Sequence, residues 1–455
     1  AYEIPKRDWS SDVCSSDLRF RVVLAAIFLV VARTASAESL NLYNGARHLG
    51  ATTCGGSTCH QSPTPWMGSM VLQNEFSIWS TQDRHSRSYR SLLTPRAQRI
   101  AKNLGISAPA QSPSCLNCHA DNVALEMQSR QFSIADGVGC EVCHGGAENW
   151  LGQHVSGSGY RASNVAVGMF PTHDPLARGT LCLSCHQGDQ SRQFSHRLLG
   201  AGHPRLRFEL DTYIAAQPAH FRVDASYVKR KGGYSNVQNW AIGLSLQVEN
   251  AMEALSRSEI RPGAATMDFG LFECSACHRN LPMSDTNSSG RLRGLGEPRL
   301  QTANIVLMQV AADGYRLSSG IRLKGMEKSL LDAFRRGDAG SLRSIAKVVA
   351  GEARDLAREI AAASVDFDPT DELLDRILHL AAAGAFDDFG GAEQVVMSVT
   401  AILSQMARDG KIVQKDAAAS AMENLYRTVD DVTRFDSTAY RLALTGIGHI
   451  AIRRR

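Results

Sequence analysis

Beyond residue 37, the sequence lacks any apolar run long enough to cross a bilayer as a helix, which takes about 20 residues. It also lacks an excess of one charge, since 49 basic and 45 acidic residues give a net charge of +4 over 455 residues. This balance, with no concentrated basic patch, argues against a nucleic-acid partner. Residues 291–455 contain neither cysteine nor tryptophan. The cysteine chemistry of the chain is therefore confined to the part before residue 290.

Two segments precede the expected mature chain. Residues 1–18 include "RDWSSDVCSSDL", which looks like the translation of a sequencing-library adapter, so we set Cys14 aside. Residues 19–37 follow the pattern of a secretory signal peptide, with a basic start, the apolar run "VVLAAIFLVVA" and the small residues "ASA". The alternative is an uncleaved membrane anchor, but the apolar run is short for a span. We expect a mature chain from near Glu38, exported to a bacterial periplasm or beyond, with no membrane span after cleavage.

The ten remaining cysteines form five pairs, and each pair is followed directly by histidine. Only 14 histidines occur in the chain, so five such adjacencies are not accidental. Two thiols separated by two residues can add to the two vinyl groups of one porphyrin, and the next residue then supplies the proximal ligand to iron. The five pairs are Cys54 and Cys59, Cys115 and Cys118, Cys140 and Cys143, Cys182 and Cys185, and Cys274 and Cys277. The predicted proximal ligands are His60, His119, His144, His186 and His278.

The first pair departs from this spacing, because four residues separate Cys54 from Cys59. Gly55 and Gly56 would let the backbone bulge away from the porphyrin edge. We therefore predict five covalently attached haem c groups. Zinc ribbons and structural disulfides are the alternatives, but neither explains a histidine directly after every pair.

Nine histidines remain, and seven of them precede the last cysteine. This clustering favours bis-histidine coordination, which gives lower reduction potentials than methionine ligation. His379 instead falls on the polar face of a predicted helix, opposite Leu373, Leu374 and Ile377, and should be solvated. The candidate distal ligands are His85, His154, His196, His203, His220 and His48.

The predicted fold is mainly α. Residues 38–290 should form a pentahaem cytochrome c domain of short helices and loops around the haems, with one long helix within residues 234–260. Residues 291–455 are rich in alanine and should form a helical bundle of unknown role. Within it, Ile345, Val349, Ala353, Leu356 and Ile360 share one helical face. A second helix should begin at Pro369, capped by Asp368.

The region from about Tyr43 to Leu281 resembles the multihaem cytochromes c of the cytochrome c-554 family, which are distantly similar to the hydroxylamine oxidoreductases. The resemblance is carried by "DRHSRSY", "GVGCEVCHGGAENWL", "GAGHPRLRFELD" and "FECSACHRNLP". It implies a mostly helical fold with haems in close-packed pairs and a role in electron transfer. It also implies that His85 is a distal ligand to a haem other than its nearest one.

Two functions remain open. The first is an exported multihaem electron carrier between redox partner proteins. The second is a multihaem oxidoreductase with an open haem site acting on a small nitrogen or sulfur compound, and the choice favours the carrier because all five motifs end in histidine. Removing residues 1–37, which hold five basic and four acidic residues, leaves +4 − 5 + 4 = +3. With roughly two carboxylates on each haem the charge becomes about −7, which favours partners with a basic docking patch.

Overall fold

The computed structural model describes residues 45–67, 71–156, 161–189, 191–192, 194–257, 269–274 and 299–450. The adapter-like segment, the predicted signal peptide, Cys277 and His278 lie outside the described residues. By its internal contacts the chain divides into two compact units, Ala1–Asn41 and Leu42–Arg455, and all of the described residues belong to the second. None of the helices in the described part has the length and apolar character needed to cross a membrane.

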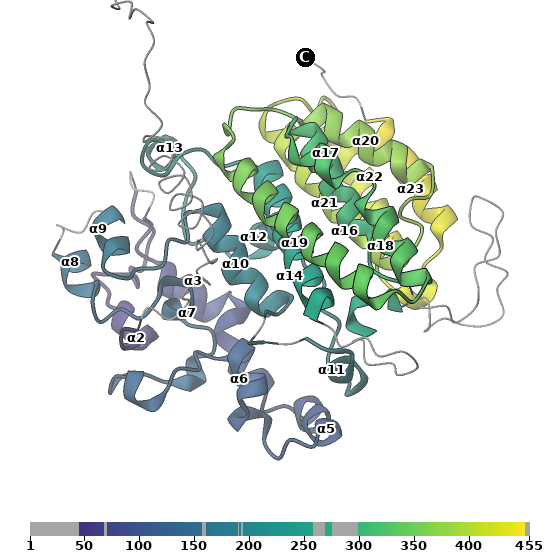
Figure 1. The fold of residues 1–455 in the computed structure, drawn as a ribbon. Helices are drawn as coiled ribbons and strands as arrows, with labels where there is room; N and C mark the ends of the chain where they lie inside the picture. The colour runs from purple at the N-terminus through teal and green to yellow at the C-terminus, as the bar shows by residue number, and fades with distance from the viewer. Residues whose placement is uncertain are drawn as a thin grey trace, which may run out of the picture. The chain divides into compact units, whose positions relative to one another are not determined.

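Short helices joined by loops make up the chain as far as residue 231, coloured purple to teal in Figure 1. Among the described residues, β-structure is limited to isolated bridges, and no extended strand is present. The mainly α prediction is confirmed. The helices are α2 (Ala51–Cys54), α3 (Glu75–Thr81), η1 (Arg84–Arg87), α4 (Ser88–Ser91), α5 (Pro95–Leu104), η2 (Pro109–Gln111), α6 (Pro113–His119), η3 (Leu125–Met127), η4 (Ile134–Asp136), α7 (Cys140–His144), α8 (Leu151–Val155), α9 (Arg161–Ala166), α10 (Pro175–His186), α11 (His196–Gly200), α12 (Leu210–Ala216) and α13 (Ala225–Lys231).

Most of the described helices that follow are longer, and those after residue 299 are coloured green to yellow in Figure 1. The helices that follow are α14 (Asn236–Arg257), η5 (Phe269–Leu271), α16 (Ala303–Gly314), α17 (Ser319–Leu323), α18 (Met326–Arg335), α19 (Ala339–Ala362), α20 (Thr370–Ala382), α21 (Phe389–Arg408), α22 (Lys415–Thr428), η6 (Val432–Arg434) and α23 (Ser437–Gly448). The expected long helix is α14.

Helix α14 lies at the centre of the main hydrophobic core. It packs against α19 and α16 on one side and against α10 and α12 on the other. Gly243 permits the contact with α12, since a Cβ there would lie 2.4 Å from the Leu210 Cβ. One continuous cluster of buried apolar residues extends from Leu183 to Ile450. The boundary expected near residue 290 falls outside the described residues, and the core joins the helices before and after it.

The apolar faces of the C-terminal helices bury as their periodicity predicts. In α19, Val349, Ala353, Leu356 and Ile360 are buried, whereas Ile345 is half-buried near the helix start. In α20 the cap differs by one residue from the expected arrangement. Pro369 is the N-cap, and the Asp368 carboxylate accepts a hydrogen bond from the Thr370 amide at 3.2 Å. His379 is exposed, as expected.

The part before α10 buries little apolar surface of its own. Among its described residues, Leu92, Leu116 and Ala120 form one small cluster, and Phe170 packs with Ala177 and Leu181 of α10. Its other buried apolar side chains, among them Trp79 and Trp150, belong to no cluster. Scattered buried side chains of this kind make a small core for more than a hundred residues, since folded domains depend mainly on apolar burial for stability. This region therefore needs additional apolar material, and covalently bound porphyrins would supply it.

Candidate haem sites

Three of the predicted attachment motifs lie at the carboxyl ends of helices. His119, His144 and His186 are the last residues of α6, α7 and α10. On a helix, residues three and four positions apart share one face. The two cysteines of each motif and the histidine that follows therefore point to the same side, as attachment to one porphyrin requires. None of the nine described cysteines is in a disulfide.

In the first motif a turn, and not a helix, brings His60 back to Cys54. Helix α2 ends at Cys54, and the His60 amide donates a hydrogen bond to the Cys54 carbonyl at 3.2 Å. Gly55 has an ordinary φ of −81°, so its role is space and not an unusual backbone conformation. A Cβ at Gly55 would lie 3.0 Å from the Phe76 ring, and one at Gly56 would lie 3.3 Å from the Cys59 sulfur. The linker therefore has little room for a side chain at either position, and the contact is tighter at Gly55.

Three of the described proximal histidines each face a second histidine from a distant part of the chain. The ring centres are 6.0 Å apart for His60 and His154, 6.1 Å for His186 and His85, and 6.2 Å for His119 and His203. Two imidazoles bound to opposite sides of one metal, each with a metal–nitrogen distance of about 2 Å, have ring centres about 6 Å apart. All three separations match this value, so the residues present fit haem iron with two histidine ligands.

Hydrogen bonds hold the Nδ1 atom of most of these rings, which leaves Nε2 as the coordinating atom. His60 Nδ1 lies 2.9 Å from Glu75 Oε2, and His85 Nδ1 lies 2.9 Å from Asp83 Oδ1. Neither carboxylate was predicted from the sequence. Asp83 stands two residues before His85, so the sequence could have indicated it, whereas Glu75 stands fifteen residues after His60 and only the fold brings it close.

Two further rings are held by uncharged oxygens. His119 Nδ1 lies 3.0 Å from the Ser91 hydroxyl, and His203 Nδ1 donates to the Pro204 carbonyl at 2.8 Å. Such contacts fix the orientation of a ligand and differ in how strongly they raise its basicity. The four rings therefore present two kinds of ligand environment, one carboxylate-supported and one neutral.

Burial keeps the rings of His144 and His186 in the neutral form that binds a metal. It lowers the pKa of His144 to about 4, with a further contribution from His220, and it lowers the pKa of His186 to about 4. Both imidazoles are therefore neutral at pH 7, and a neutral imidazole offers the lone pair that a metal requires. The His186 ring also lies 4.8 Å from the Phe208 ring and 5.5 Å from the Tyr213 ring, measured between centres.

His220 is the histidine with the largest electrostatic effect on His144. It shares a carboxylate with His85, since its Nε2 lies 3.8 Å from Asp83 Oδ2. Burial opposes the ionisation of Asp83, but hydrogen bonds from His85 and Gln217 outweigh it and lower the pKa of Asp83 well below its usual range. The carboxylate is thus ionised and connects the surroundings of the third and fourth motifs.

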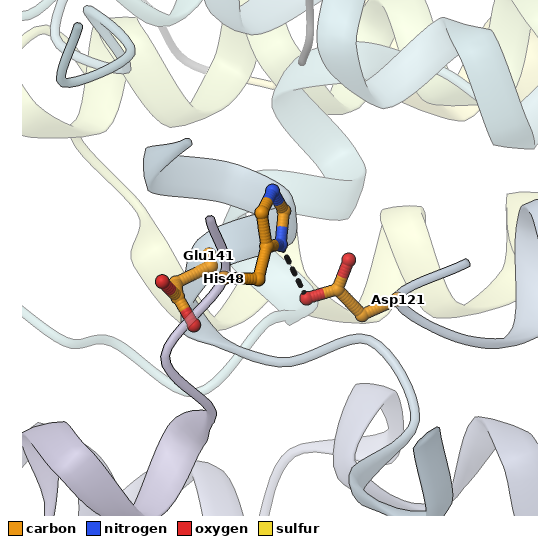
Figure 2. Close-up of side chains that lie close together, drawn as sticks. All are labelled: His48, Asp121 and Glu141. Carbon is orange, nitrogen blue, oxygen red and sulfur yellow. Dashed lines mark hydrogen bonds and ion pairs between the residues drawn. The ribbon is translucent and has the colours of Figure 1, made fainter. Parts of the chain in front are cut away.

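His48 is engaged with carboxylates. It is 1% exposed, and its Nδ1 lies 2.8 Å from Asp121 Oδ2 (Figure 2). Burial opposes protonation of His48, but Asp121 outweighs it and raises the pKa of the imidazole. Glu141 lies on the other side, and the ligand atoms of the three residues are within 4.8 Å of one another. His48 is not among the three ring pairs found in the described part of the chain.

Glu141 acts as a structural staple in this cluster. Its side chain is 2% exposed, and its two oxygens accept hydrogen bonds from the amides of Leu49, Gly50 and Ala147 at 2.7–2.8 Å. The segment before the first motif is thereby fastened to the third motif. No ion is needed to satisfy this carboxylate.

Replacing Glu141 with glutamine is expected to lower the free energy of unfolding by about 1–3 kcal/mol, because an amide nitrogen would face one of the buried backbone donors. The measurement is guanidinium unfolding followed by circular dichroism. Glu148→Gln is the matched control, since Glu148 is exposed and accepts one amide hydrogen bond, from Arg47 at 3.0 Å. Equal stability of the two variants would contradict the staple.

Cysteines from different motifs also lie close together. The Cys54 thiol interacts with that of Cys140, and the Cys118 thiol interacts with that of Cys185. Cys143 is within electrostatic range of Cys182 and Cys185. The first motif therefore neighbours the third, the third neighbours the fourth, and the fourth neighbours the second.

The fifth motif is described only at Cys274. Burial raises the pKa of this thiol, and Arg205, Glu273 and Glu393 act on it electrostatically. Arg205 and Arg207 both pair with Glu393 of α21. Helix α11, which begins at the distal candidate His196, packs against η5 just before Cys274.

One comparison with known proteins finds a match. Residues 54–145 match the family model described as cytochrome c554 and c-prime, and this span contains the first three motifs. That part of the chain is cytochrome c554-like. No curated protein and no solved structure matches the chain. The cytochrome c554-like match supports haem c as the cofactor of this part of the chain and electron transfer as its general role.

Proposed function

We propose that this protein is an exported pentahaem electron carrier in which each iron has two histidine ligands. The observation that carries the proposal is the recurrence of a 6.0–6.2 Å separation between a proximal histidine and a distant one at three sites. Bound haem supplies the reversible one-electron change of its iron. The chain supplies attachment, axial ligands and low solvent access.

The ligand sets follow from which rings the fold brings together. In the proposal, His60 pairs with His154, His119 with His203, His186 with His85, and His144 with His220. The last pair is supported by the electrostatic effect of His220, which lowers the pKa of His144. His196 is assigned to the fifth site because α11 packs against η5. His48 is not assigned to a haem, because it lies with Asp121 and Glu141.

The contacts between cysteines support an order of sites that differs from their order in the sequence. They favour a path from the first site to the third, then to the fourth and the second. His85 and His220, assigned to the fourth and third sites, approach the same Asp83 carboxylate, which supports the middle step. The secretory pattern of residues 19–37 supports export, since c-type cytochromes typically function outside the cytoplasm.

Intact-mass measurement of the mature protein tests the proposal. After expression in a host that attaches haem c, we expect cleavage near Glu38 and the added mass of five haems. The double variant Cys115→Ala/Cys118→Ala should carry four, because the second site then has no thiol for attachment. His379→Ala is the control and should retain all five. A polypeptide with no added mass in the same host would contradict the proposal.

The ferric EPR spectrum separates the carrier from the alternative, a multihaem oxidoreductase acting on a small nitrogen or sulfur compound. Wholly low-spin signals are expected if every iron has two histidine ligands. A high-spin component that changes on addition of nitrite or sulfite would favour the enzyme.

A further inference from the structure

Exposed apolar side chains gather beside the first and third sites. The exposed fractions are 53% for Trp66, 81% for Met67, 37% for Val71, 37% for Phe221 and 43% for Val223. Exposed large apolar residues are unremarkable when scattered but indicate an interaction site when they are contiguous. We call this set the Trp66 surface.

Backbone contacts show that the two segments of the Trp66 surface are neighbours. Val71 and Phe221 form an antiparallel bridge, and the Trp66 amide donates to the Leu72 carbonyl at 2.8 Å. The Phe221 ring packs on Tyr227 of α13, with 5.4 Å between ring centres. These contacts place the backbones of residues 66, 71, 72 and 221 next to one another, so the exposed side chains of the two segments lie in the same part of the surface.

The same segments carry residues of two haem sites. Glu75, which holds His60 Nδ1, also accepts hydrogen bonds from the amides of Leu72 and Gln73 at 2.9 and 3.1 Å. Phe221 directly follows His220, the ligand proposed for the third site. The Trp66 surface therefore lies at the end of the proposed electron path that begins with the first site.

The exposed charge around the Trp66 surface is mainly basic. Residues 61–67 and 71–73 contain no charged side chain. The segment that follows His220 adds Arg222 and Lys229, both exposed, and Lys231, whose ammonium lies 5.3 Å from the centre of the Tyr227 ring. The one carboxylate of this segment is Asp224, which accepts the Tyr227 amide at 2.9 Å as the α13 cap. An apolar centre with a basic rim results.

We infer that the Trp66 surface is the docking site for an acidic redox protein that exchanges electrons with the first and third haems. The inference rests on the proposed function. Transient redox complexes use small interfaces below about 1,200 Å², with an apolar centre and a charged rim. The net charge expected of the haem-loaded chain is negative, but charges are screened beyond about 8 Å at physiological salt, so the local basic rim decides which partner fits. An electron carrier needs both a donor and an acceptor protein. The Trp66 surface would bind whichever of the two is acidic.

Stopped-flow reduction of the holoprotein by a reduced, acidic [2Fe–2S] ferredoxin tests the inference. The wild-type second-order rate should fall with rising salt, and Arg222→Glu/Lys229→Glu should lower the low-salt rate by about tenfold or more. Trp66→Ser/Met67→Ser should lower the rate while the salt dependence remains. The control Lys328→Glu/Lys347→Glu changes two exposed lysines of α18 and α19 and should react as the wild type does.

Reduction by the methyl viologen radical, a small cation that needs no protein interface, tests the proposed function separately from the docking site. It should reduce every variant at least as fast as the wild type. Failure of the wild type to bind haem or to be reduced by viologen would overturn the proposed function. Equal ferredoxin rates for the wild type and the rim variant would overturn only the docking site. A shifted haem spectrum in Trp66→Ser/Met67→Ser would also overturn it, because those side chains would then face a porphyrin.

Discussion

Replacing His154 with alanine is expected to convert one haem of the protein from low spin to high spin. His154 lies opposite His60 with 6.0 Å between ring centres, and in the proposed pairing its removal would deprive that iron of its second histidine ligand. The high-spin haem should bind added cyanide or imidazole. EPR and optical spectra of the ferric protein measure the change, and added imidazole should restore the low-spin signal.

His379→Ala is the matched control for this substitution. His379 is exposed on α20 and should leave every haem low-spin. His203→Ala and His85→Ala should each reproduce the effect of His154→Ala at a different haem, so pairs of substitutions should add. A wholly low-spin spectrum for His154→Ala would contradict the pairing of His60 with His154.

The sequence determines the attachment motifs by local spacing, and spacing is enough because the cysteines and the histidine of one motif are within five residues. The same holds for the long helix α14 and for the buried face of α19, which follow from a period of 3.6 residues. Distal ligands are different. His60 and His154 are 94 positions apart, and no local pattern connects them. Their pairing depends on how the loops between motifs fold.

The supporting groups show the same limit. Asp83 could be found from its position next to His85, but Glu75 and Ser91 reach their histidines only through the tertiary fold. His48 illustrates a second difficulty. By sequence it resembles the other candidates, whereas in the structure Asp121 holds its ring, and that carboxylate follows the second motif by two residues. A histidine count alone therefore does not show which histidines the fold brings opposite a predicted proximal ring.

The division into a haem region and a helical bundle also depends on packing that composition does not reveal. Composition changes after residue 290, yet α14 precedes that point and buries Trp240, Ile242 and Leu244 almost completely in the same core as the later helices. The C-terminal helices thus cover the last long helix of the haem region, which would otherwise expose an apolar face. Stability of the two parts should be linked through this helix.

Trp240→Ala is therefore expected to lower the free energy of unfolding by about 3–5 kcal/mol, the usual cost of truncating a buried tryptophan. Trp240 is fully buried on α14, and its indole nitrogen donates a hydrogen bond to the Ser398 hydroxyl of α21 at 2.9 Å. Guanidinium unfolding measured by circular dichroism and by haem absorbance gives the free energy. Both signals should shift together, because α14 packs against helices on both sides of the expected boundary.

Two further variants separate packing from hydrogen bonding at this position. Trp240→Phe keeps most of the buried ring surface but removes the donor to Ser398, so it should cost about 1–2 kcal/mol. Leu442→Ala truncates a side chain that is 73% exposed on α23 and should change stability by less than about 0.5 kcal/mol. If Trp240→Ala shifted only the circular dichroism signal, the haem region would be stable without the bundle. A shift in both signals instead assigns the C-terminal helices a structural role in holding the haem region together, whatever else they bind.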